Sequence, residues 1–209
     1  MHRRMIGVAA LLLGALIFPA AHVTATGADI YQLRGAMADA YFTNTVGCVV
    51  STTYVIANEA REKEGPGKPQ AGSTVEVFLH QYDICTGEED SIDAHALAAI
   101  PGDAFHISSM LDGATLQATV AVYDAATHAA YPVELQVTWT GTGEVKKNKS
   151  YSHDEDGACK SNYRFKGSFR QATAEGSVTA PAGGFALAGS AQMANMMALK
   201  RGYSEVNCP

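Results

Sequence analysis

The sequence predicts an all-β protein, an antiparallel β-sandwich of immunoglobulin-like or related type, with a β-barrel as the alternative. Three observations predict this class: apolar and polar residues alternate over 115–140, about eight to ten segments have strand pattern with no convincing long helix, and four cysteines are present. Strands at such short spacing are typical of sandwiches and barrels, because β-α-β folds need helices between successive strands. The long strands and two expected disulfides favour the sandwich.

The segment 115–140 has the clearest strand pattern. Every second residue is apolar in both halves, as expected where successive side chains leave a strand on opposite faces. The apolar positions are Leu116, Ala118, Val120 and Val122 in the first half, and Val133, Leu135, Val137 and Trp139 in the second. Because the link 124–130 is polar or small, the segment is predicted to be an antiparallel hairpin with one buried and one wet face.

The other elements are predicted from runs of β-branched and aromatic residues. Residues 26–42 fit helical and strand spacing equally well, and we expect an irregular lead-in that becomes a strand. Further strand pattern covers 45–58, 74–85, 94–100, 105–110 and 162–178, and the segments 185–199 and 203–208 close the domain. The charged or turn-rich segments 59–73, 86–93 and 144–157 are predicted to be loops.

The first 25 residues are predicted to be a signal peptide that is removed. Residues 1–5 are basic, residues 6–18 are apolar but too short to span a membrane, and residues 23–25 are small enough for cleavage. The leader looks bacterial. We therefore expect residues 26–209 to form a single exported domain, extracellular or periplasmic, without a membrane span.

The charge balance of the mature chain is acidic. Removal of Arg3 and Arg4 lowers the Lys and Arg count from 15 to 13, against 21 Asp and Glu, which leaves a net charge of −8. A chain of this charge is repelled by nucleic acid and by anionic lipid, so no nucleic-acid partner is expected. The hydrophobic fraction of 47% is large enough for a core.

Four cysteines remain after cleavage, and an even number in an exported chain predicts two disulfides. Three connectivities are open. The pairs Cys48–Cys85 and Cys159–Cys208 are favoured, because each then joins neighbouring segments. Each bond is expected to add about 2–4 kcal/mol by restricting the unfolded chain.

Two acidic segments offer oxygen ligands to calcium, the one cofactor that the sequence suggests. The ligands are Glu88, Glu89, Asp90 and Asp93 in the first segment, and Asp154 and Asp156 in the second. Calcium needs about six to eight oxygens, and neither segment has a complete set, so the alternative is a solvated acidic turn.

One strand face is basic. Arg164, Lys166 and Arg170 share a parity within 162–178, and they could bind an anionic glycan or an acidic protein. The alternative is the ordinary wet face of a strand, where charges also deter edge pairing.

The function that these observations favour is a non-enzymatic binding or structural module of the cell envelope or extracellular space. Its partner would be a protein or glycan, contacted through the three predicted loops. One alternative is a secreted hydrolase with a loop site of acidic residues and His80, His106 or His153, although the sequence has no G-x-S-x-G or H-E-x-x-H motif. The other is a calcium-stabilised module of adhesion type.

Overall fold

The computed structural model describes the backbone of residues 27–65, 68–87, 91–156 and 159–208, and the side chains of these residues except 27–29, 155–156 and 208. Within these ranges the protein consists of ten strands and one short 3-10 helix, η1 (Pro181–Gly183). The strands are β1 (Gly27–Val46), β2 (Val49–Glu64), β3 (Gln70–Asp83), β4 (Ile92–Ile100), β5 (Phe105–Ile107), β6 (Gly113–Asp124), β7 (Ala129–Asp156), β8 (Cys159–Ala180), β9 (Phe185–Ser190) and β10 (Met193–Cys208).

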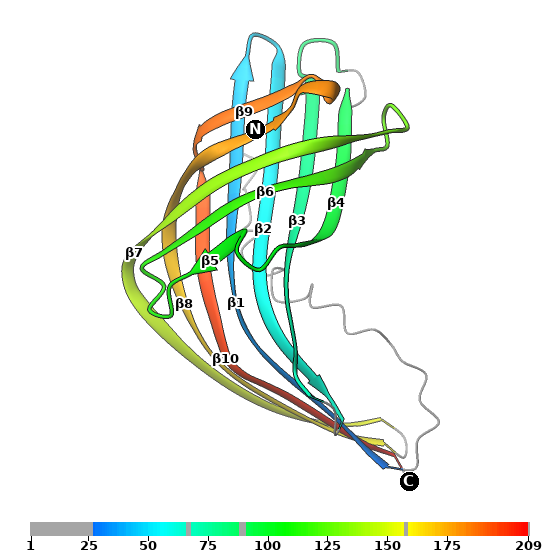
Figure 1. Ribbon diagram of the computed structural model, residues 1–209, viewed down its shortest axis with the longest axis vertical. Helices are drawn as coiled ribbons and strands as arrows, with labels where there is room; N and C mark the ends of the chain where they lie inside the picture. Colours follow the sequence, from blue (N-terminus) through cyan, green and yellow to red (C-terminus); the bar gives the residue numbers. More distant parts are fainter. Residues whose placement is uncertain (1–26, 66–67, 88–90, 157–158, 209) are drawn as a thin grey trace, which may run out of the picture.

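All ten strands belong to one antiparallel sheet, which confirms the predicted all-β antiparallel class. The strand order is β10-β1-β2-β3-β4-β6-β7-β8-β9, and β8 also pairs with β10, so the pairing closes into a ring. The two separate sheets of a sandwich are replaced by this single sheet. The reason is the length of β7 and β8, which bend across the front of β1 to β4 and continue downward beside β10 (Figure 1).

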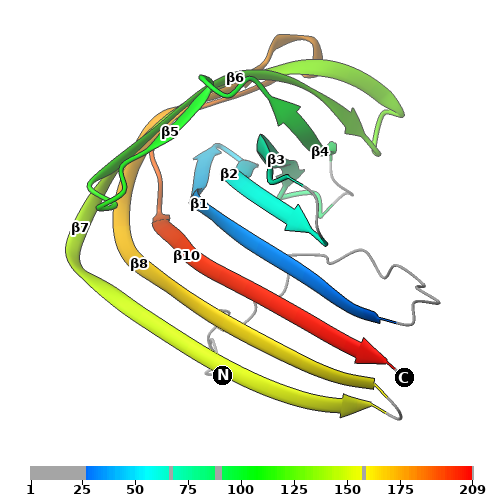
Figure 2. The same cartoon turned by 60° about the horizontal axis from the view of Figure 1, so that its bottom comes forward.

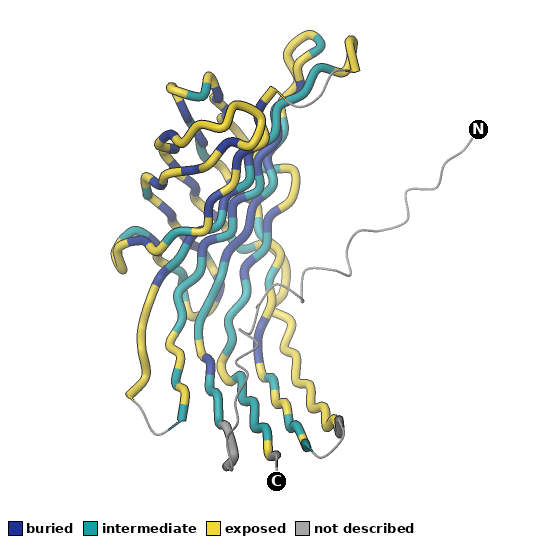
Figure 3. The backbone as a smooth tube through the Cα atoms, turned by 90° about the vertical axis from the view of Figure 1, so that its right-hand side faces the viewer, coloured by how far each residue is buried: buried dark blue, intermediate teal, exposed yellow. Residues whose placement is uncertain are grey.

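The sheet has a closed upper part and an open lower part. The lower part, here called the open extension, consists of residues 27–35, 60–65, 143–156, 159–170 and 199–208. Its strands run side by side in the order β7, β8, β10, β1 and β2 (Figure 2). Buried residues concentrate in the closed part, whereas much of the open extension is exposed (Figure 3).

The closed part contains the hydrophobic core, and the predicted hairpin lines it as the alternation indicated. The core-facing residues of β7 are 0–2% exposed from Val133 to Trp139. The indole Nε1 of Trp139 donates a hydrogen bond to the backbone oxygen of Asp39, 2.8 Å away, and the ring of Phe105 meets it edge-on at 6.4 Å. Trp139 therefore ties β7 to β1 through the core.

Two predicted loops prove to be strands. Residues 144–157 lie on β7 as far as Asp156, and most of 59–73 belongs to β2 and β3. Residues 26–42, predicted to be an irregular lead-in that becomes a strand, form strand β1 from Gly27 onward, without an irregular part in the described residues. These stretches lack one continuous apolar face because the sheet does not pack on the hydrophobic core in the open extension. Residues 86–93 include the turn after β3, but positions 88–90 lie outside the described residues.

The open extension is stabilised on one face by an apolar strip. Across β8, β10 and β1, Phe165 and Leu33 flank Gly202, while Leu199 lies between Gly167 and Gly35. The missing side chains of these glycines leave room for their large neighbours: a Cβ on Gly167 would lie 2.9 Å from the ring of Phe165. Leu33 is consequently only 6% exposed.

The disulfide Cys48–Cys85 is confirmed, with 5.5 Å between the Cα atoms. It joins the turn after β1 to the turn after β3. The register of Asn207 with Lys160 places the backbone of Cys208 opposite Cys159. The side chain of Cys208 lies outside the described residues, so the second bond stays a prediction.

Asp124 stabilises the shortest strand pairing in the ring, the one between β4 and β6. Strands β4 and β6 share only two paired positions, Ala94 with Asp124 and His95 with Tyr123. Asp124 is only 1% exposed. Its carboxylate accepts four hydrogen bonds. The donors are the backbone N–H of Asp93 (3.2 Å) and Ala126 (3.0 Å), and the hydroxyls of Thr127 (2.9 Å) and Tyr131 (3.3 Å). Burial alone would raise the pKa of Asp124, but these bonds together hold it below its ordinary value.

We expect Asp124→Ala to lower the free energy of unfolding by about 3 kcal/mol, since it leaves several buried donors without an acceptor. Because the folded pKa of Asp124 is depressed, its stabilisation is present above the unfolded pKa and is lost as the pH falls through the folded pKa. Denaturant unfolding at neutral pH and in acid measures both effects. Equal losses for Asp124→Ala at both pH values would contradict a role for the ionised carboxylate.

Candidate functional site

The Lys and Arg residues in the described part of the protein are concentrated in one region. The sequence has no Lys or Arg between Arg34 and Arg61, between Lys68 and Lys146, or between Arg170 and Lys200. Of the 13 that follow residue 25, 12 lie in the open extension, and Lys68 lies just beyond β2. The closed part carries acidic residues instead, among them Asp39, Glu76, Glu134 and Glu175.

Five of these cations form a line across the five strands of the open extension, here called the basic row. In strand order they are Lys149, Lys166, Arg201, Arg34 and Arg61. Lys149 is paired with Lys166, and Lys166 with Arg201. Between β10 and β1 the register shifts, so that Arg34 faces the bulge formed by residues 200 and 201, and Arg34 is paired with Arg61. With about 4.8 Å between strands, the basic row is about 20 Å long.

The basic row lies on the face that is buried in the closed part. On β1, Arg34 has the same parity as the buried Ala38 and Ala40, and on β8, Lys166 has that of Ala174. Below the core this face meets solvent, and all five cations are exposed. The apolar strip lies on the opposite face, so the basic row and the apolar strip occupy different sides of the open extension.

This arrangement costs stability. Like charges directly opposite each other on neighbouring strands are destabilising, by roughly 0.2–1 kcal/mol per pair. Among the residues that the structure describes, none of the five cations forms an ion pair that would offset this repulsion. In the described part of the protein the five cations thus repel one another without a salt bridge to an acidic side chain, and an external anion would relieve this repulsion.

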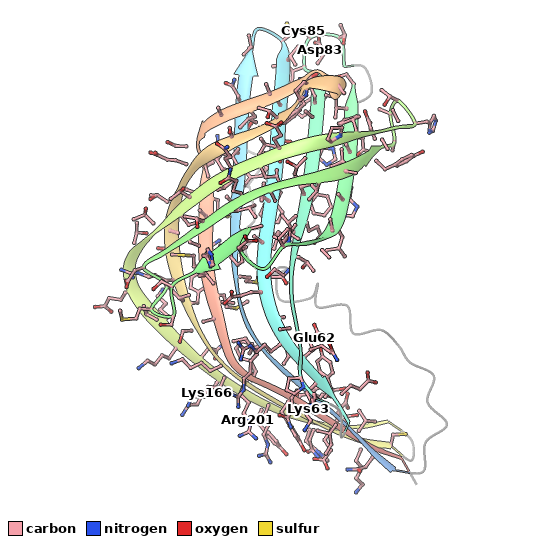
Figure 4. All side chains as sticks on the ribbon, in the orientation of Figure 1. Glu62, Lys63, Asp83, Cys85, Lys166 and Arg201 are labelled. Carbon is pink, nitrogen blue, oxygen red and sulfur yellow. A yellow bond between two sulfur atoms is a disulfide. The ribbon has the colours of Figure 1, made fainter. Side chains whose placement is uncertain are left out.

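A second row on the same face supports the first. It lies two residues further along the strands and consists of Tyr151, Arg164, Tyr203, Gln32 and Lys63. The Arg164 guanidinium lies 5.7 Å from the centre of the Tyr151 ring, and that of Arg201 lies 5.9 Å from the Tyr203 ring. Such contacts favour a fixed position for each guanidinium. Figure 4 shows Lys63, Lys166 and Arg201 together at the lower end of the molecule.

Of the three basic residues that the sequence grouped, two contribute to this surface and one does not. Arg164 and Lys166 lie on the exposed face. Arg170, with only 18% of its side chain exposed, is bound at the junction with the closed part. It pairs with Asp112 and donates hydrogen bonds to the backbone oxygens of Gly143 (3.1 Å) and Leu111 (3.4 Å).

A hollow of about 350 Å³ lies at this junction. Lys147, Ser168 and Lys200 line it together with Met110 and Arg170. Since Lys147 and Ser168 are paired neighbours, two residues from Lys149 and Lys166, the hollow adjoins the basic row. It extends the positive face toward the closed part.

The acidic residues proposed for calcium lie largely outside the part of the protein whose side chains are described. Glu88, Glu89 and Asp90 lie outside the described residues, as does the side chain of Asp156. Asp93 on β4 has an oxygen 3.4 Å from Nδ1 of His80, and Asp154 lies near the far end of β7. Calcium binding thus stays a prediction for these residues.

One group of ligand type is present within the described ranges, Cys48, Asp83 and Cys85. Its two sulfurs are bonded to each other, and an Asp83 oxygen accepts the backbone N–H of Cys85 (2.7 Å) and Thr86 (3.1 Å). These contacts define a turn beside a disulfide rather than a metal centre.

The histidines suggested for a hydrolase lie on strands that are not hydrogen-bonded neighbours. His80 is on β3, His106 on β5 and His153 on β7. Nδ1 of His153 lies 3.0 Å from the side-chain oxygen of Asn162. The sheet therefore does not bring the three histidines to one place.

Comparison with known protein families, with curated proteins and with solved structures finds no match. Within the described ranges, no helix has the length and apolar character to span a membrane.

Sequence reasoning missed Lys149, Arg201, Arg34 and Arg61, because they come from four distant segments. The three intervals without Lys or Arg, the longest between Lys68 and Lys146, are the sequence signal that points to segregated charge. Only the strand register shows that the cations lie in a row.

We expect Lys166→Gln to stabilise the protein at low salt, because it removes the central member of two like-charge pairs. The gain in unfolding free energy should be about 0.4–2 kcal/mol for the two pairs and should shrink at high salt, where the repulsion is screened. Urea unfolding at two salt concentrations measures it. Lys146→Gln is the matched control, since Lys146 lies on β7 opposite Phe169, on the other face. A loss of stability in Lys166→Gln would contradict the repulsive row.

Proposed function

We propose that this protein is an exported, non-enzymatic binding module that holds an anionic polysaccharide of the cell envelope or extracellular space on the basic row. The observation that carries the proposal is a line of five exposed cations, in cross-strand register, with no ion pair among the described residues. A sheet keeps like charges opposite one another at a cost. Binding of a polyanion neutralises the cations and so removes the repulsion that destabilises the sheet.

The shape of the surface favours a polymer over a small anion. The five cations spread over about 20 Å of sheet instead of converging on one point. A small anion would contact two of them at most and would leave the others repelling one another. A chain of linked anionic groups neutralises all of them at once.

The charge of the whole molecule favours a polysaccharide over nucleic acid. Apart from the open extension the chain is acidic, and loss of Arg3 and Arg4 takes the net charge from −6 to −8. A long nucleic acid would meet that acidic remainder as well as the basic row. An exported protein also meets glycans rather than nucleic acid as its common polyanions.

The test is binding to a glycosaminoglycan that carries both carboxylates and sulfates, measured by calorimetry at low salt. We expect Lys149→Gln/Lys166→Gln to weaken binding about tenfold to thirtyfold, since each cation near an anionic surface contributes about 1 kcal/mol. The matched control is Lys68→Gln/Lys146→Gln, which removes the same charge away from the basic row. Equal weakening by both double variants would show non-specific attraction, and no binding by the unchanged protein would overturn the proposal.

A further inference from the structure

We infer that the ligand of the basic row is a linear polymer of uronic acid that lies across the strands, with one carboxylate for each strand that it crosses. This inference rests on the function proposed above and specifies its ligand. Its basis is the direction, the spacing and the chemical type of the cations.

The direction of the bound polymer relative to the strands follows from the longest uninterrupted line of cations. Along β8, the residues of this face are Asn162, Arg164, Lys166 and Ser168, so that a ligand following the strand meets two cations before it reaches neutral residues. Across the strands, the basic row offers five cations without interruption. A polyanion therefore gains most by running perpendicular to the strands.

The spacing selects among polyanions. Neighbouring strands are about 4.8 Å apart, so the basic row presents one cation at about this interval. One ring of a 1→4-linked uronic acid chain has a similar length and carries one carboxylate. Stacked nucleic acid has a phosphate about every 3.4 Å along each strand, and the charges of inorganic polyphosphate are closer still. The charge spacing of both polymers is therefore shorter than the spacing of the cations in the basic row.

The chemical type of the cations agrees with carboxylates. Three of the five members, Arg201, Arg34 and Arg61, are arginines, whose planar fork matches a carboxylate in a bidentate contact. The Tyr203 ring lies under the Arg201 guanidinium, and the Tyr203 hydroxyl donates to Glu205 at 3.1 Å. Tyr203 thus acts as a positioning residue for Arg201, and Gln32 in the second row offers an amide to sugar hydroxyls.

The experiment is calorimetric titration of the protein with oligouronates of increasing length. Affinity should rise with each unit up to about five, the number of cations in the basic row, and then level off for a single site. The methyl-esterified oligomers, which have the same rings but no charge, should not bind. A plateau at two units, or equal binding of the esters, would overturn the inference.

The orientation has its own test. The variant Lys149→Gln/Arg61→Gln removes both ends of the basic row and leaves its centre, so the plateau should move from about five units to about three. The matched control Lys68→Gln/Lys146→Gln should leave the plateau unchanged, because Lys146 lies on the opposite face and Lys68 lies beyond β2. An unchanged plateau in the double variant would show that the ligand does not run across the strands.

Competing polyanions separate this inference from the proposed function. Inorganic polyphosphate and a short DNA duplex of equal charge should bind at least about tenfold more weakly than the oligouronate, because their charge spacing does not match the strands. If the glycosaminoglycan binds but the oligouronate has no advantage over polyphosphate, the uronate inference fails and the proposed function stands. If no polyanion binds, both fail.

Discussion

The register between long antiparallel strands is the constraint on which this structure depends. Strands β7 and β8 remain paired from Glu134 and Thr179 in the closed part to Asp156 and Cys159 at the far end of the open extension. Each residue of one strand is thereby fixed opposite one residue of the next, with a single shift between Thr142 and Lys146. The same constraint aligns the core around Trp139 and, further down, aligns cations from five strands. A one-residue slip would transfer a whole strand to the other face.

The chemical character of each face of the sheet changes along the length of the strands. In the closed part, the inner face is apolar, and the buried joints at Trp139 and Asp124 hold the ring together. Below the core, the same face becomes basic, and Phe165, Leu33 and Leu199 form an apolar strip on the opposite face. The stability of the closed part and of the apolar strip offsets the repulsion within the basic row. Local conflicts of this kind are typical of functional surfaces, where an arrangement that lowers stability is retained for binding.

Sequence patterns predicted the parts of this fold that have one apolar face. The hairpin of β6 and β7 was recognised down to its buried residues, and Cys48–Cys85 followed from the proximity of the segments. The lower half of β7 was predicted to be a loop, because Lys147, Lys149 and Tyr151 leave no apolar parity there. The basic row could not be predicted, since Arg34 and Lys166 become neighbours of Arg201 only through pairing between distant strands. Arg170 shared the parity of Lys166, but its partner Asp112 comes from the segment before β6, which no local pattern reveals.

The location and direction of the bound anion are the central claim, and amide chemical-shift mapping with a five-unit oligouronate measures both. The largest shifts are expected at Lys149, Lys166, Arg201, Arg34 and Arg61, one position on each strand of the open extension. The amides of Val120 and Val122 on β6, in the closed part, are expected to stay unchanged. Shifts that follow one strand, or that gather around Leu33 and Phe165 on the apolar face, would contradict the claim that a polyanion lies across the basic row.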